Sequence, residues 1–479
     1  MRITLISPWG SPCGISVYAG DVYAELVSRG HEVQVLAYEE SMPAEVKLDL
    51  PVHRVWKIGQ SPGWQVMHQI HEFKPDIIHV QHEIGLFCPG AIWREWLECL
   101  RATNVPVVVT YHSLPDVPTV FTDLPVSLAV VCSPIGSTIL SSRVDFPVMT
   151  IEHGVDGSIP RERPVEPYSL ASFGFLSECK GYHRILEAMH LLRSELPQLN
   201  LTIMGALSPR AYGQQLNYFR LLHRRVHELG LTGQVDLSCG FRTQREVQAC
   251  LSRKAVGLLH YDRTDRMSVA ADFLDERSDS AVRSMQTSSP VSQATSPASQ
   301  YFEYGRSSMV PPPEGIDPFE ELSTSGALFR RDGYRDEFAQ EAAVDESMGI
   351  EALATSGSAA RPHTSIRAGR ARTRPLKPWL PQMGTAGVRC QSAALYRMWS
   401  AGLPCIVSQA QHFDVGAPAE EAVIRASDVP QLADQIRRMF VEPDAYTKAV
   451  SQLASRLTRT WKDVADDYEQ ALSLALTSN

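Results

Sequence analysis

Short apolar runs alternate with amphipathic stretches over the first third of the chain. Arg2–Ile6 is a mainly apolar run followed by a loop rich in Gly and Pro, and from about Ser16 apolar residues recur at helical spacing as far as Gly30. Later apolar runs are typical of strands buried on both faces of a parallel sheet: 33–37, 76–80, 105–110 and 127–132. This repeat of strand, loop and helix predicts an α/β fold with a doubly wound parallel sheet, which binds ligands at the carboxyl ends of its strands.

The alternation starts again after Ile151. Strands are predicted at 172–176, 199–204, 234–237, 256–259 and 404–407, and helices up to residue 191 and over 218–229, 392–402, 429–440, 444–457 and 461–476. We therefore expect two Rossmann-like domains, made of residues 1–150 and of residues 151–261 plus 388–460, and a C-terminal helix in residues 461–479.

Residues 262–387 interrupt this pattern. The stretch 278–308 is rich in Ser, Gln, Thr and Pro, and 361–377 contains six basic residues and no acidic one. Such segments bury too little apolar surface to offset the chain entropy lost on folding. The sequence predicts a long, largely disordered insert, with short helices near 268–276 and 334–343.

The net charge and the cysteine content argue against some classes of function. The net charge of −9 argues against non-specific nucleic-acid binding, which requires a basic surface. The nine cysteines include no C-x-x-C pair, which fits a reducing compartment and predicts no zinc site. No apolar run is long enough for a secretory signal or a membrane span, so we expect a cytoplasmic protein and leave peripheral membrane contact open.

Three loops carry candidate chemistry. Lys180 and Gly181 lie between a strand and a helix, where a cation and helix-start amides favour an anion. Gly14 and Ile15 open the first helix in a similar loop, which could also be a plain tight turn. His112 directly follows a buried strand, so its ring is either a structural group or part of a site.

A fourth polar group, in the run from His79 to Glu83, contains metal-ligand types. His79 and Gln81 lie on one face of the predicted strand and His82 on the other. Because zinc ligands converge on one point, we expect no metal site here.

Several motifs together resemble the family-4 glycosyltransferases of the GT-B fold. They are the Lys180-Gly181 loop, the His-Gly-Val-Asp sequence at 153–156, and Gly402-Leu403-Pro404 before an apolar strand. The resemblance implies two Rossmann-like domains facing across a cleft, a final helix returning to the first domain, and metal-independent transfer of a sugar with retention from a nucleotide sugar.

The same resemblance implies the roles of individual residues. The donor diphosphate would be held by Lys180 and Gly181, with Gly205 close to the nucleotide. The catalytic residue would be His112. The acceptor and phosphate side would be formed by Gly14, Ile15, Gln81 and Glu83.

The family's hallmark pair of glutamates is absent, because the two positions are Arg389 and Arg397. A sub-group of the family reads Thr-Ser-Gly-x-Leu-x-Arg instead, and residues 392–397 resemble that version. Ser392, Leu395 and Arg397 would then bind the donor, with Arg397 either contacting the donor or pairing with an acid across the crevice. The stretch 324–330 repeats this motif inside the insert.

Three functions fit this resemblance. The first is a hexosyltransferase in glycan or glycoconjugate synthesis, with no resident cofactor, using a nucleotide-sugar donor and a glycan, lipid-linked or small-molecule acceptor. The second is a degenerate, non-catalytic transferase that binds a nucleotide sugar or a partner, favoured by the missing glutamates. The third is a nucleotide-sugar epimerase of the same fold.

Overall fold

The computed structural model describes residues 1–39, 48–87, 91–114, 125–157, 165–208, 212–262, 388–389 and 391–477. The predicted insert therefore lies outside the described residues, except for Asp262 at its start. The two short helices expected within it and the motif at 324–330 also lie outside them.

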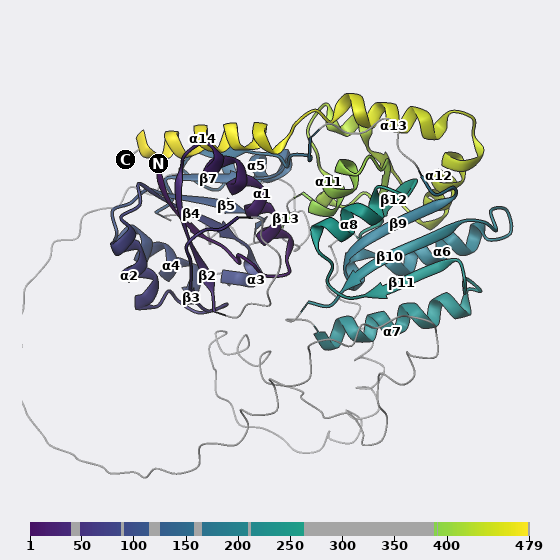
Figure 1. The fold of residues 1–479 in the computed structure, drawn as a ribbon, viewed down its shortest axis with the longest axis horizontal. Helices are drawn as coiled ribbons and strands as arrows, with labels where there is room; N and C mark the ends of the chain where they lie inside the picture. Colours follow the sequence, from purple (N-terminus) through teal and green to yellow (C-terminus); the bar gives the residue numbers. More distant parts are fainter. Residues whose placement is uncertain are drawn as a thin grey trace, which may run out of the picture. The chain divides into compact units, whose positions relative to one another are not determined.

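The first domain is built on a seven-stranded parallel sheet with the strand order β3-β2-β1-β4-β5-β7-β8 (Figure 1). Its strands are β1 Arg2–Ile6, β2 Glu32–Tyr38, β3 Val52–Trp56, β4 Ile77–His82, β5 Val107–Tyr111, β7 Leu128–Val131 and β8 Val148–Thr150. Its helices are α1 Gly14–Ser28, α2 Trp64–Phe73, α3 Ile84–Phe87, α4 Ala91–Arg101 and α5 Pro134–Ser141.

Neighbouring residues of these strands belong to opposite cores. Leu5 and Val108 pack in the cluster on one face of the sheet, and Ile6 and Val109 pack in the cluster on the other. This is why the strands are continuous apolar runs, because successive side chains point to opposite faces and both faces are covered.

The second domain is built on a six-stranded parallel sheet with the strand order β11-β10-β9-β12-β14-β15. Its strands are β9 Ser169–Phe175, β10 Asn200–Ala206, β11 Val235–Cys239, β12 Val256–Leu259, β14 Cys405–Val407 and β15 Ile424–Arg425. Its helices are α6 Tyr182–Leu192, α7 Tyr212–Glu228, α8 Gln244–Leu251, α11 Ala393–Ser400, α12 Val429–Val441 and α13 Ala445–Arg456, with a 3₁₀ turn, η2, at Glu178–Lys180.

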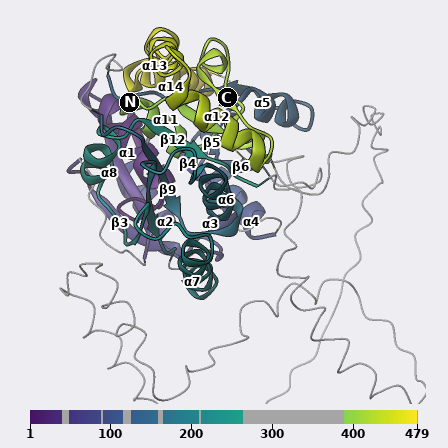
Figure 2. The ribbon, with the colours of Figure 1, turned by 90° about the vertical axis from the view of Figure 1, so that its right-hand side faces the viewer.

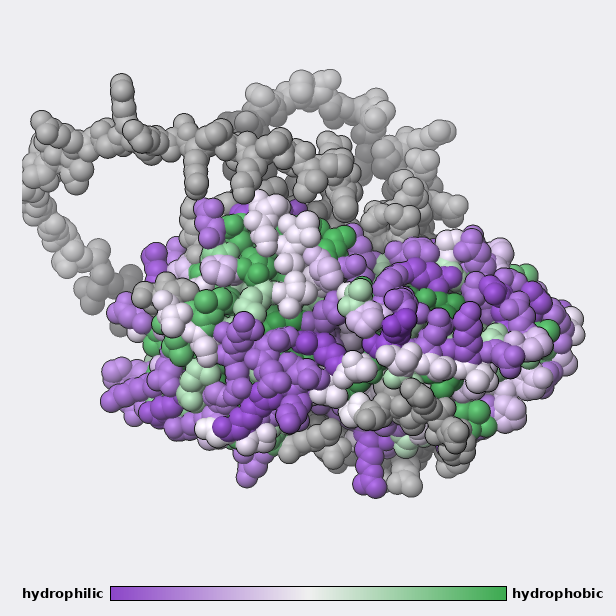
Figure 3. Space-filling view, turned by 90° about the horizontal axis from the view of Figure 1, so that it is seen from above, coloured by the Kyte–Doolittle hydropathy of each residue, from purple (hydrophilic) through white to green (hydrophobic). Residues whose placement is uncertain are grey.

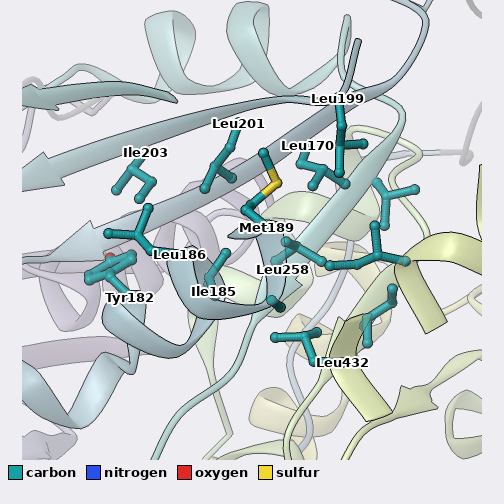
Figure 4. Close-up of a cluster of buried hydrophobic side chains, with 14 of the residues drawn as sticks. Leu170, Tyr182, Ile185, Leu186, Met189, Leu199, Leu201, Ile203, Leu258 and Leu432 are labelled. Atoms are coloured by element: carbon teal, nitrogen blue, oxygen red, sulfur yellow. The ribbon is translucent and has the colours of Figure 1, made fainter. Parts of the chain in front are cut away.

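The core of this second sheet forms under α6 and α12, which lie side by side (Figures 1 and 2). Ile185 and Met189 of α6 pack against Leu201 of β10 and Leu258 of β12, and Leu432 of α12 joins the same cluster (Figure 4). The two parallel sheets and their helices confirm the predicted pair of Rossmann-like units.

The last helix, α14 Trp461–Thr477, completes the core of the first sheet. It packs against α1 (Figure 1), and the hydroxyls of Tyr18 and Tyr468 are joined by a hydrogen bond of 2.8 Å in this buried layer. On the outer side of α14, Arg29 forms ion pairs with Asp466 and Glu469 at 2.6 and 2.8 Å. Hydrophilic side chains cover much of the face of the molecule seen in Figure 3. The end of the chain is therefore part of the first domain.

One short backbone pairing joins the two segments that link the domains, and a second joins the domains directly. Val155 pairs with Thr460 where the chain passes between the domains in both directions, and the Val155 amide donates to the Arg459 carbonyl at 2.9 Å. The other pairing is antiparallel, between β6 Ser113–Leu114 and β13 Val388–Arg389. Among the described residues no helix is long and apolar enough to cross a membrane.

Candidate functional site

Each sheet has one point where the strand order reverses. In the first sheet β1 lies between β2 and β4, and in the second β9 lies between β10 and β12. Ligands of open α/β sheets bind in the crevice beyond the carboxyl ends of the strands at such a point. The loops after β1, β4, β9 and β12 are therefore the first places to look for a site.

The loop after β9 packs tightly on the end of β12. Gly181 has a φ of 63°, and a Cβ atom at this position would lie 1.9 Å from the carbonyl oxygen of His260. The Asp262 amide donates to the Cys179 carbonyl at 3.0 Å, which fixes the same loop from the other side. Glycine at 181 is thus required by packing, and its predicted contact with the donor stays a prediction.

Lys180 projects from this loop onto an aromatic ring. Its Nζ lies 3.8 Å from the centroid of the Tyr261 ring, in cation–π geometry. The Tyr261 hydroxyl hydrogen-bonds to the Ser392 hydroxyl at 3.0 Å, and Tyr261 itself is only 2% exposed. Tyr261 therefore joins the predicted lysine to the start of α11.

The start of α11 lies next to the start of α1. Ser392 is the N-cap residue of α11, and a Cβ atom added to Gly14 would lie 3.8 Å from the Cβ of Ala393. Two helix N-termini, one from each domain, thus meet at this point, where their partial positive charges favour an anion. Ile15 follows on α1 and is partly buried against the first core, whereas Leu395 is fully buried in the second-domain core.

One amide at the start of α6 is already satisfied within the protein. The His183 amide donates to the Tyr218 hydroxyl at 3.2 Å, and the ring Nδ1 of His183 lies 2.9 Å from the same oxygen. The anion site predicted at this helix start consequently has one fewer amide donor than the sequence pattern suggests.

His112 is held by a neutral amide. Its Nε2 donates to Gln81 Oε1 at 2.7 Å, since the amide oxygen can only accept, and the ring meets Tyr18 edge-on at 5.1 Å. Burial and, to a lesser extent, the neighbouring rings of His153 and His79 lower the pKa of His112 to about 3. His112 is therefore a neutral imidazole with its proton on Nε2.

Gln81 continues into a buried polar chain. Its amide nitrogen donates to Nε2 of His79 at 3.2 Å, and Nδ1 of His79 lies 2.8 Å from the Tyr23 hydroxyl. The Thr110 hydroxyl bonds both His79 and the Tyr468 hydroxyl, at 2.8 and 2.9 Å. These hydrogen bonds link Gln81, which holds the His112 ring, to Tyr468 of the C-terminal helix.

Glu83 caps the neighbouring turn. Its Oε2 accepts from the Gly85 amide at 2.7 Å, and its Oε1 accepts from the Ser113 hydroxyl at 3.4 Å. His82 points to the opposite side, into rings of Phe87, Trp93 and Tyr111. His79 and His82 thus diverge as expected, and no metal-binding cluster of His, Cys, Asp or Glu exists within the described ranges.

The comparisons agree with this architecture. The sequence model described as Glycosyltransferase Family 4 matches residues 12–129. Sucrose-phosphate synthase from Thermosynechococcus elongatus superposes with a TM-score of 0.60 at 13% identity, covering 100% of both chains. HepE of Anabaena, solved with UDP and glucose, gives 0.56 at 13% identity over 99% of both chains.

The chain has the GT-B fold. A glycosyltransferase from Rickettsia africae gives a TM-score of 0.57 at 9% identity, over 100% of this chain and 99% of that one. A search of curated proteins gives no significant sequence match. The resemblance to family-4 glycosyltransferases of the GT-B fold is thereby confirmed, in sequence for residues 12–129 and in fold for the chain.

Arg397, at one of the two positions where the resemblance led us to expect glutamate, forms a cluster with two acids. It pairs with Asp156 at 2.6 Å and with Asp21 of α1, and its side chain is only 14% exposed. Of the two contacts expected for Arg397, the structure contains the pairing with an acid of the other domain. At the second position, Arg389, the backbone pairs with Ser113 in β13 and β6.

The space around Arg397 is small. A cavity of about 10 Å³ is lined from both domains by residues that include Gly14, Tyr18, Asp21, His153 and Tyr396. This volume has room for about one water molecule. The domains of this GT-B chain are therefore in close contact beside the two helix starts.

Gly205 has a packing role. A Cβ atom there would lie 2.4 Å from the Leu176 side chain, so the strand end of β10 needs glycine to accommodate the loop after β9. Its predicted closeness to the nucleotide stays a prediction.

The structure brings the predicted residues into two groups. Lys180, Gly181 and Ser392 lie around Tyr261, and His112, Gln81 and Glu83 lie at the carboxyl ends of β4 and β5. No sequence motif marks Tyr261 or Asp21. Tyr261 was detectable as a large side chain two residues after a fully buried strand, whereas Asp21 is one of several polar residues on α1 and carries no such signal.

Proposed function

We propose that this chain is a glycosyltransferase that moves a hexosyl group from a nucleotide-diphosphate sugar to an acceptor with retention, in glycan or glycoconjugate synthesis. The observation that carries the proposal is the convergence of Lys180, Tyr261 and the N-terminus of α11 at the point where the second sheet reverses its strand order. The solved relatives include HepE with UDP and glucose, which supports a nucleotide-sugar donor.

The proposed chemistry is electrostatic. The Lys180 ammonium and the first amides of α11 and α1 would bind the donor diphosphate and stabilise the charge that develops on it as the sugar leaves. These groups would neutralise the diphosphate without a metal ion or a resident cofactor. His112, neutral and fixed by Gln81, would orient the sugar and the incoming acceptor by hydrogen bonding.

The proposal is tested by thermal unfolding of the full chain with UDP-, GDP-, ADP- and TDP-sugars. A donor at about a hundred times its Kd adds ~2.7 kcal/mol to the free energy of unfolding. We expect a shift with one nucleotide class that is lost in Lys180→Ala, while Lys57→Ala, an exposed lysine of the first domain, keeps it. If no donor shifts the unfolding temperature of the wild-type chain, the proposal is wrong.

A second candidate function is favoured by Arg397. Because Arg389 and Arg397 replace the glutamates of the resembling enzymes, and Asp21 and Asp156 neutralise Arg397, the chain could bind a nucleotide sugar without transferring it. Stabilisation by a donor, with neither transfer to any acceptor nor slow hydrolysis of the donor, would favour this binding subunit over the enzyme.

A further inference from the structure

Tyr261 lies at the centre of the predicted donor site, although no motif singles it out. It lies two residues after the end of β12, at the point where the strand order of the second sheet reverses. Both of its ends are engaged: the ring faces the Lys180 ammonium and the hydroxyl bonds Ser392. A buried tyrosine with these two contacts connects a side-chain cation to a helix N-terminus.

The position of the Tyr261 ring is set by the second-domain core. Its backbone carbonyl accepts from the Ser408 hydroxyl at 2.7 Å, after β14. Its ring packs against Phe413 and His412, with centroids 4.7 and 5.2 Å away. The ring is therefore a fixed surface, and the Lys180 side chain rests on it.

The hydrogen bond with Tyr261 prevents Ser392 from capping its own helix. Ser392 is the N-cap residue of α11, a position whose hydroxyl usually accepts from an amide of its own helix. Here the side chain makes no such capping bond, and its hydroxyl bonds Tyr261 instead. The Ser392 side chain thus leaves the first amides of α11 uncapped, and the Leu395 amide donates to the Ser392 backbone carbonyl at 3.0 Å.

We propose that Tyr261 is a positioning residue for the donor diphosphate, which holds the Lys180 ammonium in place and keeps the Ser392 hydroxyl from capping α11. The inference rests on the proposed function, because it assumes that a nucleoside diphosphate binds at this point. A free lysine side chain loses rotamer freedom when it binds a ligand, and a ring that already holds its ammonium reduces this loss.

Two variants separate the contributions of the ring and the hydroxyl. Tyr261→Phe keeps the ring and frees Ser392 to cap α11, so we expect about three- to tenfold weaker binding, the effect of one hydrogen bond. Tyr261→Leu removes the ring as well, and we expect binding about tenfold weaker or more. Tyr168→Leu, which removes a ring at the amino end of β9, controls for general destabilisation of the same domain.

The experiment is calorimetric titration of the full chain with UDP, GDP, ADP and TDP, using the one that the wild-type chain binds most tightly. The decisive comparison is a double-mutant cycle with Lys180→Ala. If the ring acts through Lys180, the weakening that Tyr261→Leu adds to that of Tyr261→Phe is lost once Lys180 is absent. Equal weakening in both backgrounds, or unchanged binding by Tyr261→Leu in the wild-type background, overturns the inference.

A different result would overturn the proposed function. If the wild-type chain binds none of the four nucleotides, the donor site itself is wrong, and the role of Tyr261 falls with it. If the wild-type chain binds and Tyr168→Leu weakens binding as much as Tyr261→Leu, the proposed function stands and only the positioning role is overturned.

Discussion

Arg397 on α11 pairs with Asp21 on α1, so one ion pair joins the two domains beside the meeting point of their helix starts. The Asp21 and Arg397 side chains are 6% and 14% exposed, and Asp156 is a second partner of Arg397 at 2.6 Å. Removing one partner of a buried pair leaves the other charge uncompensated, which costs about 3–5 kcal/mol. We expect a loss of this order in Arg397→Met, measured by urea unfolding.

The matched control for this prediction removes both charges. Asp21→Asn combined with Arg397→Met should recover much of the loss, because no buried carboxylate at position 21 is then left without its counter-charge. Asp21→Asn alone should be milder than Arg397→Met, since Arg397 keeps Asp156. Equal losses in Arg397→Met and in the double variant would show that the pair does not stabilise the domain contact.

The hydrogen bond between His112 and Gln81 predicts a pH effect. The Tyr18 ring contacts His112 edge-on, and burial, together with smaller contributions from His153, His79 and His82, keeps the pKa of His112 near 3. In Gln81→Glu a carboxylate would face the ring and favour its charged form, which raises the pKa of His112. We expect this variant to lose activity as pH falls from 7 to 5, measured as donor turnover.

The control is Gln81→Met, which is close in size and brings no charge. Its turnover should fall at all pH values without a new titration between pH 5 and 7, because only the orientation of His112 is lost. Identical pH profiles for Gln81→Glu and the wild-type chain would contradict the proposed contact.

Most of the fold could be predicted because buried parallel strands are continuous apolar runs. The run 105–110 predicted β5 Val107–Tyr111, and 256–259 matched β12. The edge strand β3 was missed because it contains His53 and Arg54 and has only one fully buried residue, Trp56. Helix α5 was missed because its eight residues are too few for a clear helical period.

The contacts of the site could not be predicted in the same way. Lys180 and Ser392 were found because a loop or motif marks them, but the residue that joins them, Tyr261, belongs to no motif. Arg397 and Asp21 are 376 positions apart, and only the packing of two domains brings them together. Local patterns thus locate the loops of a site, whereas its partners depend on tertiary structure.

Four histidines whose pKa is strongly lowered predict acid sensitivity. Burial lowers the pKa of His79, His82 and His112 to about 3 and that of His153 to about 4, against about 6.5 in the unfolded chain. Above pH 6.5 both states are neutral and no stability is lost. As pH falls from 6.5 toward 4 the unfolded chain binds protons that the folded chain excludes, and each histidine costs up to about 1.4 kcal/mol per pH unit.

His82→Phe tests this directly. Neither ring nitrogen of His82 has a hydrogen-bond partner among the described residues, and its neighbours are aromatic rings. We expect the variant to be about 1 kcal/mol more stable at pH 7 and to lose less stability between pH 6 and 5, measured by urea unfolding. The exposed His68→Gln should change neither quantity, and a pH slope that stays unchanged in His82→Phe would contradict the assignment.

The crossing of the two interdomain segments makes Gly154 indispensable. A Cβ atom there would lie 2.6 Å from both the Thr460 carbonyl carbon and the Trp461 amide nitrogen, which are backbone atoms held in place by the bridge between Val155 and Thr460. Gly154→Ala must therefore separate the two segments, at a cost of about 1–3 kcal/mol typical of overpacking. Because Trp461 opens α14, we also expect faster proteolysis of the C-terminal helix.

Gly213→Ala is the control for this change, since a Cβ atom there meets nothing within 4 Å and the residue lies in helix α7. That variant should be unchanged or more stable by up to about 1 kcal/mol, as alanine favours a helix over glycine. Urea unfolding measures the stability of both variants, and limited proteolysis measures the protection of α14 in each. If Gly154→Ala is as stable as Gly213→Ala and α14 stays equally protected, the two segments are not in the contact described, and the C-terminal helix is fixed by its own apolar face alone.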